Sequence, residues 1–316
     1  MIGWIGTGIM GASMARNLMN RGHELCIYSR TRDKARPLLD AGAHWAASPA
    51  EVAQESAIVF SMVGYPADVE EVALGAHGVL AGFAQAEAQA EAQPQTTAST
   101  SRDNLPGDPP RIYVDMTTSE PTLATRIAAV AAKQGVATLD APVSGGDIGA
   151  REGRLAIMVG GEEQTYATVL PYFEILGQTI QLMGGAGAGQ HTKMANQILV
   201  ASGMVATVEA LLYAVSAGLD MDATIDVVGS GAASSWAVNN LGRRIAKGDM
   251  EPGFMIRHFM KDMGIALSEA ERMRLSLPGL ALARQFYTAA MAEGLADRGT
   301  QALYAVYQRL NARDDS

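Results

Sequence analysis

The strongest constraint on the fold is a short apolar run that leads directly into three spaced glycines. Residues 2–5 read Ile-Gly-Trp-Ile, and an amphipathic stretch follows the glycines at residues 12–18. In a strand, turn and helix of this kind, Gly6 permits the tight turn, Gly8 lets the backbone approach a pyrophosphate, and Gly11 lets the helix pack closely on the strand. The N–H groups that open the helix favour phosphate charge. We predict a dinucleotide site here, with a purely structural glycine turn as the alternative; its expected contact residues are Gly6, Thr7, Gly8, Ile9, Met10 and Gly11.

Composition narrows the class of protein. A chain of 316 residues can bury a large core and predicts two domains. The formal net charge of −9 argues against nucleic acid as a partner. We expect no membrane association, because no apolar run approaches the roughly 18 residues of a membrane span, and no export signal is visible. Cys26 is the single cysteine and no Cys/His cluster has ligand spacing, so we predict no disulfide within the chain, no metal and a cytoplasmic location.

The first half of the chain alternates short apolar runs with helical stretches, which is typical of a doubly wound α/β domain. The predicted strands are Ile2–Ile5, Leu25–Tyr28, Ala57–Val63, Ile112–Met116, Ala137–Asp140, Leu155–Val159 and Ile180–Met183. The predicted helices are Gly11–Asn20, Thr31–Ala41, Pro49–Gln54, Pro66–Leu74, Pro121–Gln134 and Glu163–Leu176. Residues 84–111 do not fit this pattern: Gln-Ala-Glu repeats and a Pro-rich end indicate an exposed insertion.

The second half has helical spacing and few strand signals. We therefore predict a first domain at residues 1–184 and an all-helical domain at residues 185–316. Within the latter, residues 190–217 are apolar nearly all round, which predicts a helix buried on most sides, between domains or between subunits. Such a surface predicts a homo-oligomer, either a dimer or a tetramer.

The end of the second predicted strand bears on the choice between the two nicotinamide cofactors. An acidic residue there would select NAD by binding the ribose diol, whereas basic or small polar residues accommodate a 2′-phosphate. This chain has Ser29, Arg30 and Thr31 at that position and no acid before Asp33. NADP(H) is therefore favoured and NAD(H) stays possible, the alternative being that the arginines are simply solvated.

Two further stretches carry polar residues in patterns that suit catalysis. Ser144, followed by Gly145 and Gly146, offers a cluster of donors for a carboxylate or a carbonyl oxygen, although a turn alone would explain it. Lys193, Asn196 and Gln197 stand at i, i+3 and i+4 and share one helix face. Small and apolar residues surround Lys193 in sequence, so burial is expected to lower its pKa toward neutral pH. The alternative is a lysine that pairs within the joint between the domains. The pair Lys261-Asp262 would by itself be a solvated ion pair.

Taken together and in this order, these motifs resemble the β-hydroxyacid dehydrogenase family over nearly the whole chain. The resemblance implies a Rossmann-type domain followed by a helical substrate and dimerisation domain. It implies that Lys193 exchanges a proton with the substrate oxygen while hydride passes to or from the nicotinamide. It implies further that Ser144, Gly145 and Gly146 bind the substrate carboxylate and that Asn196 and Gln197 orient substrate and lysine. Positions that line the cofactor in the family are matched by Met62, Val63, Thr117, Thr118 and Lys261.

The chain departs from the family pattern at three places. Thr117-Thr118 stands where Ser-Thr is common, Asn196-Gln197 stands where Asn-Asn is common, and the 84–111 insertion has no counterpart. Residues 231–236 lie where substrate-selecting side chains are expected. The leading hypothesis is an enzyme that interconverts a small β-hydroxy acid, similar to 3-hydroxyisobutyrate, and its semialdehyde. The alternatives are an imine reductase, which generally lacks the lysine, and a catalytically silent NADP-binding module.

Overall fold

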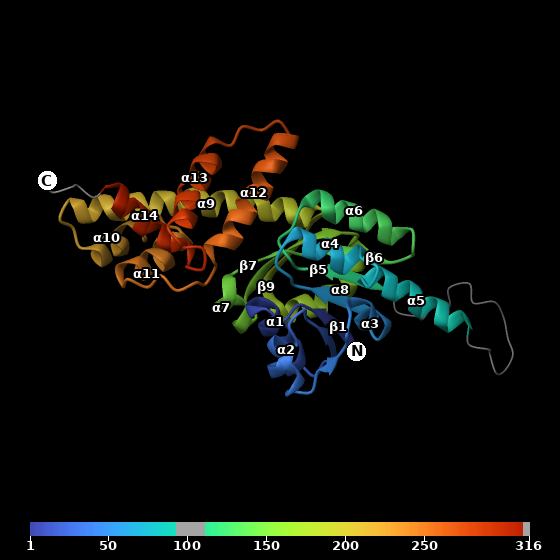
Figure 1. The fold of residues 1–316 in the computed structure, drawn as a ribbon. Coiled ribbons are helices and arrows are strands. Elements are labelled where there is room, and N and C mark those ends of the chain that lie inside the picture. Colours follow the sequence, from blue (N-terminus) through green and yellow to red (C-terminus); the bar gives the residue numbers. More distant parts are fainter. Residues whose placement is uncertain (93–110, 312–316) are drawn as a thin grey trace. The chain divides into compact units, whose positions relative to one another are not determined.

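A computed structural model describes residues 1–92 and 111–311 of the chain (Figure 1). These residues form two compact units, Met1–Lys193 and Met194–Ser316, which are described separately below. The domain boundary expected after residue 184 stays a prediction.

The first unit is built on one mixed sheet. Its parallel part has the strand order β3-β2-β1-β4-β5-β6. Beyond it, β8 runs antiparallel to both β6 and β7 and parallel to β9. The strands are β1 (Ile2–Ile5), β2 (Leu25–Tyr28), β3 (His44–Trp45), β4 (Ile58–Ser61), β5 (Ile112–Asp115), β6 (Ala137–Asp140), β7 (Val143–Ser144), β8 (Leu155–Gly161) and β9 (Gly177–Gly184). The doubly wound class is confirmed. The two-residue strands β3 and β7 were not predicted, because so short a run carries no periodic signal.

Helices cover both faces of this sheet because successive side chains of a strand point to opposite faces. Trp4 and Phe60 belong to a core that includes residues of α1 and α8, whereas Ile5 and Val59 belong to a second core on the other face with residues of α3, α4 and α6. The helices are α1 (Ile9–Asn20), α2 (Arg32–Leu39), α3 (Pro49–Gln54), α4 (Pro66–Leu74), α5 (Val79–Ala92), α6 (Pro121–Ala132), α7 (Gly146–Glu152) and α8 (Glu163–Leu176).

Helix α5 corrects the prediction of an insertion at residues 84–111. It packs on α3 and α4 and continues to Ala92, so the first nine of those residues are helical. Leu80 and Phe83 anchor it in the core, and the Gln, Ala and Glu residues that follow are good helix formers. The rest of the predicted insertion, residues 93–110, lies outside the described residues.

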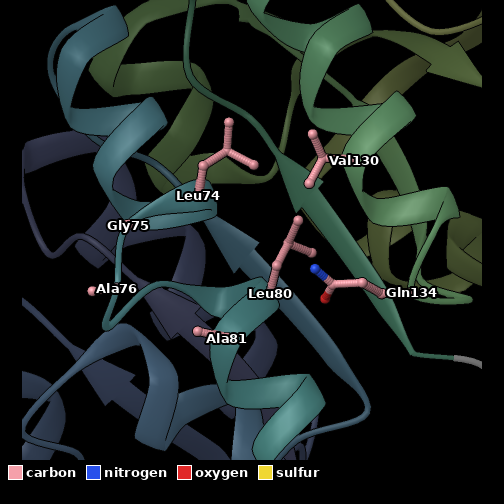
Figure 2. A pocket seen from close by; sticks show the side chains of 7 residues that line it. All are labelled: Leu74, Gly75, Ala76, Leu80, Ala81, Val130 and Gln134. Carbon is pink, nitrogen blue, oxygen red and sulfur yellow. The ribbon is translucent and has the colours of Figure 1, made fainter.

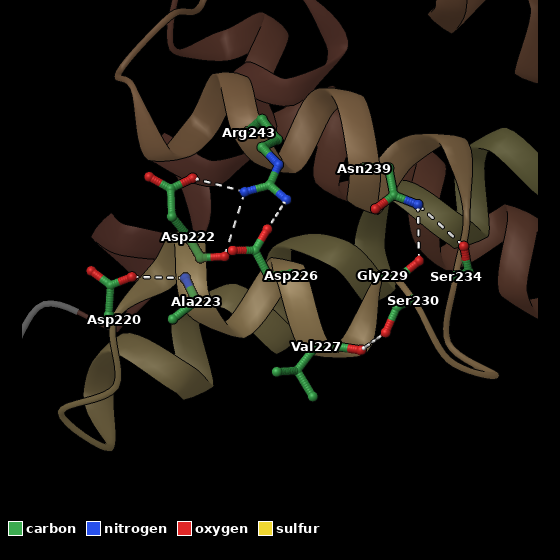
Figure 3. Close-up of polar contacts among 10 residues, drawn as sticks. All are labelled: Asp220, Asp222, Ala223, Asp226, Val227, Gly229, Ser230, Ser234, Asn239 and Arg243. Atoms are coloured by element: carbon green, nitrogen blue, oxygen red, sulfur yellow. Dashed lines mark hydrogen bonds and ion pairs between the residues drawn. The ribbon is translucent and has the colours of Figure 1, made fainter.

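The second unit is helical, as predicted, and its core draws on every long helix. It contains most of α9 (Ala188–Ser216), then α10 (Met221–Val228), a π-helical turn (Ala237–Gly242), α11 (Arg243–Ala246), α12 (Ile256–Arg272), α13 (Pro278–Ala292), a 3₁₀ turn (Thr300–Ala302) and α14 (Leu303–Leu310). Figure 3 shows how Arg243 of α11 binds the carboxylates of Asp222 and Asp226 on α10, and so joins the two helices.

Helix α9 is buried along one face in the single chain, through residues such as Met204, Val208 and Leu211, while Leu199 and Tyr213 are three-quarters exposed. Burial of its other faces between subunits stays a prediction. Within the described residues, α9 is also long and apolar enough to cross a membrane by length and composition, so the statement that no run approaches that length was wrong. The core helix of a soluble protein passes the same test.

Candidate active site

The turn between β1 and α1 has its backbone fixed by close contacts. Gly6 has φ +96°, and a Cβ there would overlap with the carbonyl oxygen of Met62. A Cβ on Gly11 would overlap with the carbonyl oxygen of Gly6, while around Gly8 there is open space. The indole N–H of the buried Trp4 donates to the Gly6 carbonyl at 2.9 Å. The turn therefore brings the helix close to the strand and leaves Gly8 accessible.

The N-terminus of α1 fits a dinucleotide phosphate. Gly8 is the N-cap residue, no side chain caps the helix, and its first turn contains no acidic residue. The N–H groups of Ile9, Met10 and Gly11 are in the first turn, where helix geometry offers no carbonyl partner. The Thr7 side chain is buried, and its hydroxyl has no hydrogen-bond partner among the described residues. These groups can hold the pyrophosphate of NAD(P).

The residues expected to choose between the two cofactors lie at the end of β2. Arg30 is exposed, and its guanidinium forms an ion pair with Asp68 of α4 at 2.6 Å. The other carboxylate oxygen of Asp68 accepts from the Tyr65 N–H at 3.1 Å. Ser29 is half-buried and Thr31 is exposed at the start of α2. Asp68 was not identified from the sequence, because it lies 38 residues after Arg30 and only the fold brings the two side chains together.

The loops after β4 and β5 meet through hydrogen bonds. The Val63 N–H donates to the Thr117 hydroxyl at 3.0 Å, and the Thr117 N–H donates to Asp115 at 3.1 Å. Ser61 also donates to Asp115, at 2.8 Å. Burial raises the pKa of Asp115 to about 6, against the opposing effect of these donors. Met62 and Thr118, the remaining two residues predicted on these loops, are half-buried beside Val63 and Thr117 in sequence.

The predicted carboxylate-binding residues lie where β7 becomes α7. Ser144 is the half-buried last residue of β7 and pairs with Ala156 of β8. Gly145 is the exposed N-cap of α7, and Gly146 is its first residue. The Asn17 amide of α1 donates to the Ala150 carbonyl at 2.8 Å and ties α7 to the cofactor helix. The three residues therefore stand together at a helix start, although the short strand β7 was not expected.

The start of α9 is held by a carboxylate from the sheet. Asp140, the last residue of β6, accepts from the Gly187 N–H at 2.7 Å and from the Gln190 N–H at 2.8 Å. Its side chain is buried, and desolvation raises its pKa to about 6 in spite of these backbone donors. Lys193 lies one helical turn after Gln190, is only 7% exposed, and is the last residue of the first unit.

The second unit holds the other predicted residues of the catalytic motif in one polar chain. The Asn196 amide donates to the Gln197 carbonyl oxygen at 2.7 Å, and the Gln197 amide donates to Asp262 at 2.6 Å. The Lys261 ammonium lies 3.0 Å from the other oxygen of Asp262, which is buried. The pair Lys261-Asp262 is thus not a solvated surface pair, and it is joined to Gln197 in the same unit.

Two other features lie outside these groups. Asn239 of the π-helical turn donates to the Gly229 carbonyl and to the Ser234 hydroxyl in the loop that precedes the turn (Figure 3). The Trp236 side chain, at the start of this turn, is 67% exposed. A pocket of about 310 Å³ lies elsewhere in the first unit. Leu74, Leu80 and Val130 are among the side chains that line it (Figure 2). None of the predicted site residues lines that pocket, which offers no titratable side chain for chemistry.

Comparison with known proteins agrees with this organisation along the chain. Residues 1–185 match the family described as the NAD binding domain of 6-phosphogluconate dehydrogenase. Residues 187–307 match the family described as NAD-binding of NADP-dependent 3-hydroxyisobutyrate dehydrogenase. The two matches meet at the start of α9.

Individual relatives cover nearly the whole chain. The Arabidopsis thaliana protein named "Probable 3-hydroxyisobutyrate dehydrogenase-like 1, mitochondrial" is 45% identical over 98% of this chain and 86% of its own length. The 2-hydroxy-3-oxopropionate reductase of Escherichia coli (strain K12) is 38% identical over 93% of this chain and 92% of its own. A structure of Mycobacterium tuberculosis 3-hydroxyisobutyrate dehydrogenase with L-serine superposes with a TM-score of 0.81, at 29% identity, over 98% of this chain and 99% of that one.

Fold, cofactor turn and relatives define an oxidoreductase that uses NAD(P)(H) and acts on a CH–OH group. The chain belongs to the β-hydroxyacid dehydrogenase family, the family of 3-hydroxyisobutyrate dehydrogenase.

Proposed function

We propose that the protein interconverts a small β-hydroxy acid, similar to 3-hydroxyisobutyrate, and its semialdehyde, with Lys193 as the general acid and base. The observation that carries this proposal is the burial of Lys193 at 7% exposure, one turn after a helix start that is anchored to the sheet. A buried ammonium has little water to compete for its proton, which suits transfer to a substrate oxygen. The nicotinamide, when bound, supplies or accepts the hydride.

The remaining roles follow from the chemistry of the residues. Ser144, with the N–H groups of Gly145 and Gly146, would bind the substrate carboxylate, because a hydroxyl and successive backbone donors suit an anion. Asn196 and Gln197 would orient the substrate and the lysine, and the Asp262 carboxylate holds the Gln197 amide in place. In the direction of oxidation Lys193 would accept the hydroxyl proton, and in the direction of reduction it would return a proton to the carbonyl oxygen.

We further propose that NADP(H) is the favoured cofactor, with Met62, Val63, Thr117, Thr118 and Lys261 lining its site. Arg30 is exposed at the end of β2, and Ser29 and Thr31 beside it offer hydroxyl donors. A guanidinium and hydroxyls bind a 2′-phosphate, whereas no acid of β2 or of the two residues after it is available for a ribose diol.

The test of this proposal is turnover, followed by the absorbance of reduced nicotinamide. NADP and NAD are each offered with 3-hydroxyisobutyrate, glycerate, 3-hydroxypropionate and serine, and K193M is measured beside the wild type. We expect wild-type turnover with at least one of these acids and a loss of about 10²–10⁴-fold in kcat for K193M, the range for a lost general acid or base.

Two outcomes would contradict the proposal. Near-normal turnover by K193M that still binds cofactor would remove the role of Lys193. Silence of the wild type with every acid, with cofactor still bound, would favour imine reduction or a silent binding module, and a panel of cyclic imines would then separate these two.

A further inference from the structure

We propose that Gln190 is a positioning residue that fixes the start of α9, and with it Lys193, against the loop after β5. This inference rests on the proposed function, because it assigns Gln190 a role through Lys193. Gln190 is fully buried, and its side chain makes two hydrogen bonds to backbone groups of that loop.

The two bonds define the position of Gln190 closely. Its amide nitrogen donates to the Thr117 carbonyl at 2.7 Å, and its amide oxygen accepts from the Ser119 N–H at 2.9 Å. A primary amide offers a donor and an acceptor side by side, so the pairing resembles that between two strands. The side chain of Gln190 therefore takes the place of a strand neighbour for residues 117–119.

Thr117, one of the residues predicted to line the cofactor, is buried and has its polar groups in hydrogen bonds. Thr117 uses its carbonyl for Gln190, its hydroxyl for the Val63 N–H, and its own N–H for Asp115. A continuous path of hydrogen bonds thus runs from the loop after β4, through Thr117, to the first turn of α9. Asp140 completes it by binding the Gly187 and Gln190 N–H groups.

Lys193 follows Gln190 by three residues on this helix, so a shift of the helix start carries the lysine with it. Catalysis is sensitive to such shifts, since a misplacement of about 1 Å can cost about 10²-fold in rate. Gln190 need not touch the substrate to affect the reaction. It sets how far the lysine lies from the loop predicted to line the cofactor.

The experiment compares Q190M with Q301M. Methionine keeps the length of glutamine but removes both hydrogen bonds. Gln301 is a matched control, because it is 1% exposed and its amide also makes two bonds to backbone, the carbonyls of Asp249 and Glu251 in the second unit. For each variant kcat, KM, the Kd of NADPH by fluorescence and the isotope effect of reduced cofactor deuterated at C4 are measured.

We expect kcat of Q190M to fall about 10- to 100-fold with the Kd of NADPH changed less than about threefold, and the isotope effect to rise as hydride transfer becomes limiting. Q301M lowers the denaturation midpoint and leaves kcat within about twofold. Q190N keeps an amide that is one methylene too short for both bonds, and an intermediate loss in kcat is expected. If Q190M does not fold, the kcat of Q190N tests the positioning role in its place.

The inference is overturned if Q190M, or Q190N in its place, has the kcat and isotope effect of the wild type, or loses no more kcat than Q301M. K193M, assayed in parallel, distinguishes a failure of the positioning role of Gln190 from a failure of the catalytic role of Lys193. An inactive K193M beside a fully active Gln190 variant removes the positioning role alone. An active K193M removes the role of Lys193 and with it the reason for positioning.

Discussion

The two glycine-rich turns of the first unit look alike in sequence, but a carboxylate of the protein binds the helix start at only one of them. Residues 6–11 and residues 184–189 each precede a helix and each contain glycines at close spacing. At the first turn no side chain caps α1, and Gly8 faces open space. At the second turn the carboxylate of Asp140 already occupies the start of α9, and a Cβ on Gly189 would overlap with the carbonyl oxygens of Met158 and Asp140.

The difference shows what a glycine-rich helix start can be used for. The positive end of a helix binds an anion, and that anion can come from a ligand or from the protein. In α1 no side chain supplies it, which fits the proposal that the cofactor phosphate binds there. In α9 the protein supplies it, so the turn is an anchor for Lys193.

Gly189→Ala should lower the free energy of unfolding by about 3 kcal/mol, because the new methyl group meets backbone that cannot move aside. Gly203→Ala, later in the same helix, has no atom near the new Cβ and should instead gain up to about 1 kcal/mol from helix propensity. Urea unfolding of the two variants checks this. Equal stabilities would mean that the start of α9 is not tightly packed.

The buried carboxylate at the anchor should make stability depend on pH. The pKa of Asp140 is raised from 3.8 to about 6, so the folded state binds more protons than the unfolded state between these values. Stability relative to D140N should therefore fall by about 2–3 kcal/mol as the pH rises from about 4 to 7. Urea unfolding of both proteins across this range measures it. If the difference in stability between the wild type and D140N did not change with pH, the N–H groups of the helix start would fully offset the desolvation of the carboxylate.

Gly8→Ala should leave the free energy of unfolding within about 0.5 kcal/mol of the wild type, because nothing lies near the new Cβ and the backbone φ of −69° suits alanine. The Kd of NADPH should rise about 10-fold or more, since the methyl group stands where the pyrophosphate must approach. Fluorescence titration and unfolding of the apo protein test both halves. Unchanged affinity would place the phosphate elsewhere.

Asp68→Asn should tighten NADPH binding a few-fold and leave NADH binding unchanged. The carboxylate competes with a 2′-phosphate for Arg30, and an exposed ion pair contributes only about 0–1 kcal/mol. Asparagine keeps an acceptor for the Tyr65 N–H. Arg30→Ala should weaken NADPH binding selectively. If neither substitution alters the ratio of the two dissociation constants, Arg30 does not read the 2′-phosphate.

Several elements could be predicted to the residue because their signals are local. Strands β1, β2 and β6 and helices α3, α4 and α8 have the predicted bounds. Each is marked by neighbours in sequence, such as the prolines at the start of α3 and α4 and the Ser48 cap whose side chain accepts from the Glu51 N–H. The predicted cofactor turn was equally local, because the roles of its glycines depend on one strand and the next helix.

Other features depended on residues far apart in the chain. Strand β7 exists because β8 turns back beside it, and α5 is a helix of the core because Leu80 and Phe83 pack on neighbours from other segments. Asp140 stood in a predicted motif, yet its partners Gly187 and Gln190 lie 47 and 50 residues later. Sequence spacing cannot predict such pairs, because the sheet and not the chain brings them together.

The class of fold and the family could thus be read from the sequence, and the site residues were predicted from it. This was possible because glycine spacing, helix starts and strand patterns act over a few residues. The tertiary structure alone decided which glycine-rich helix start is left open and which is closed by a carboxylate, and which loop Gln190 holds. Both depend on buried polar groups, which need hydrogen-bond partners, and these partners come from segments that only the fold brings together.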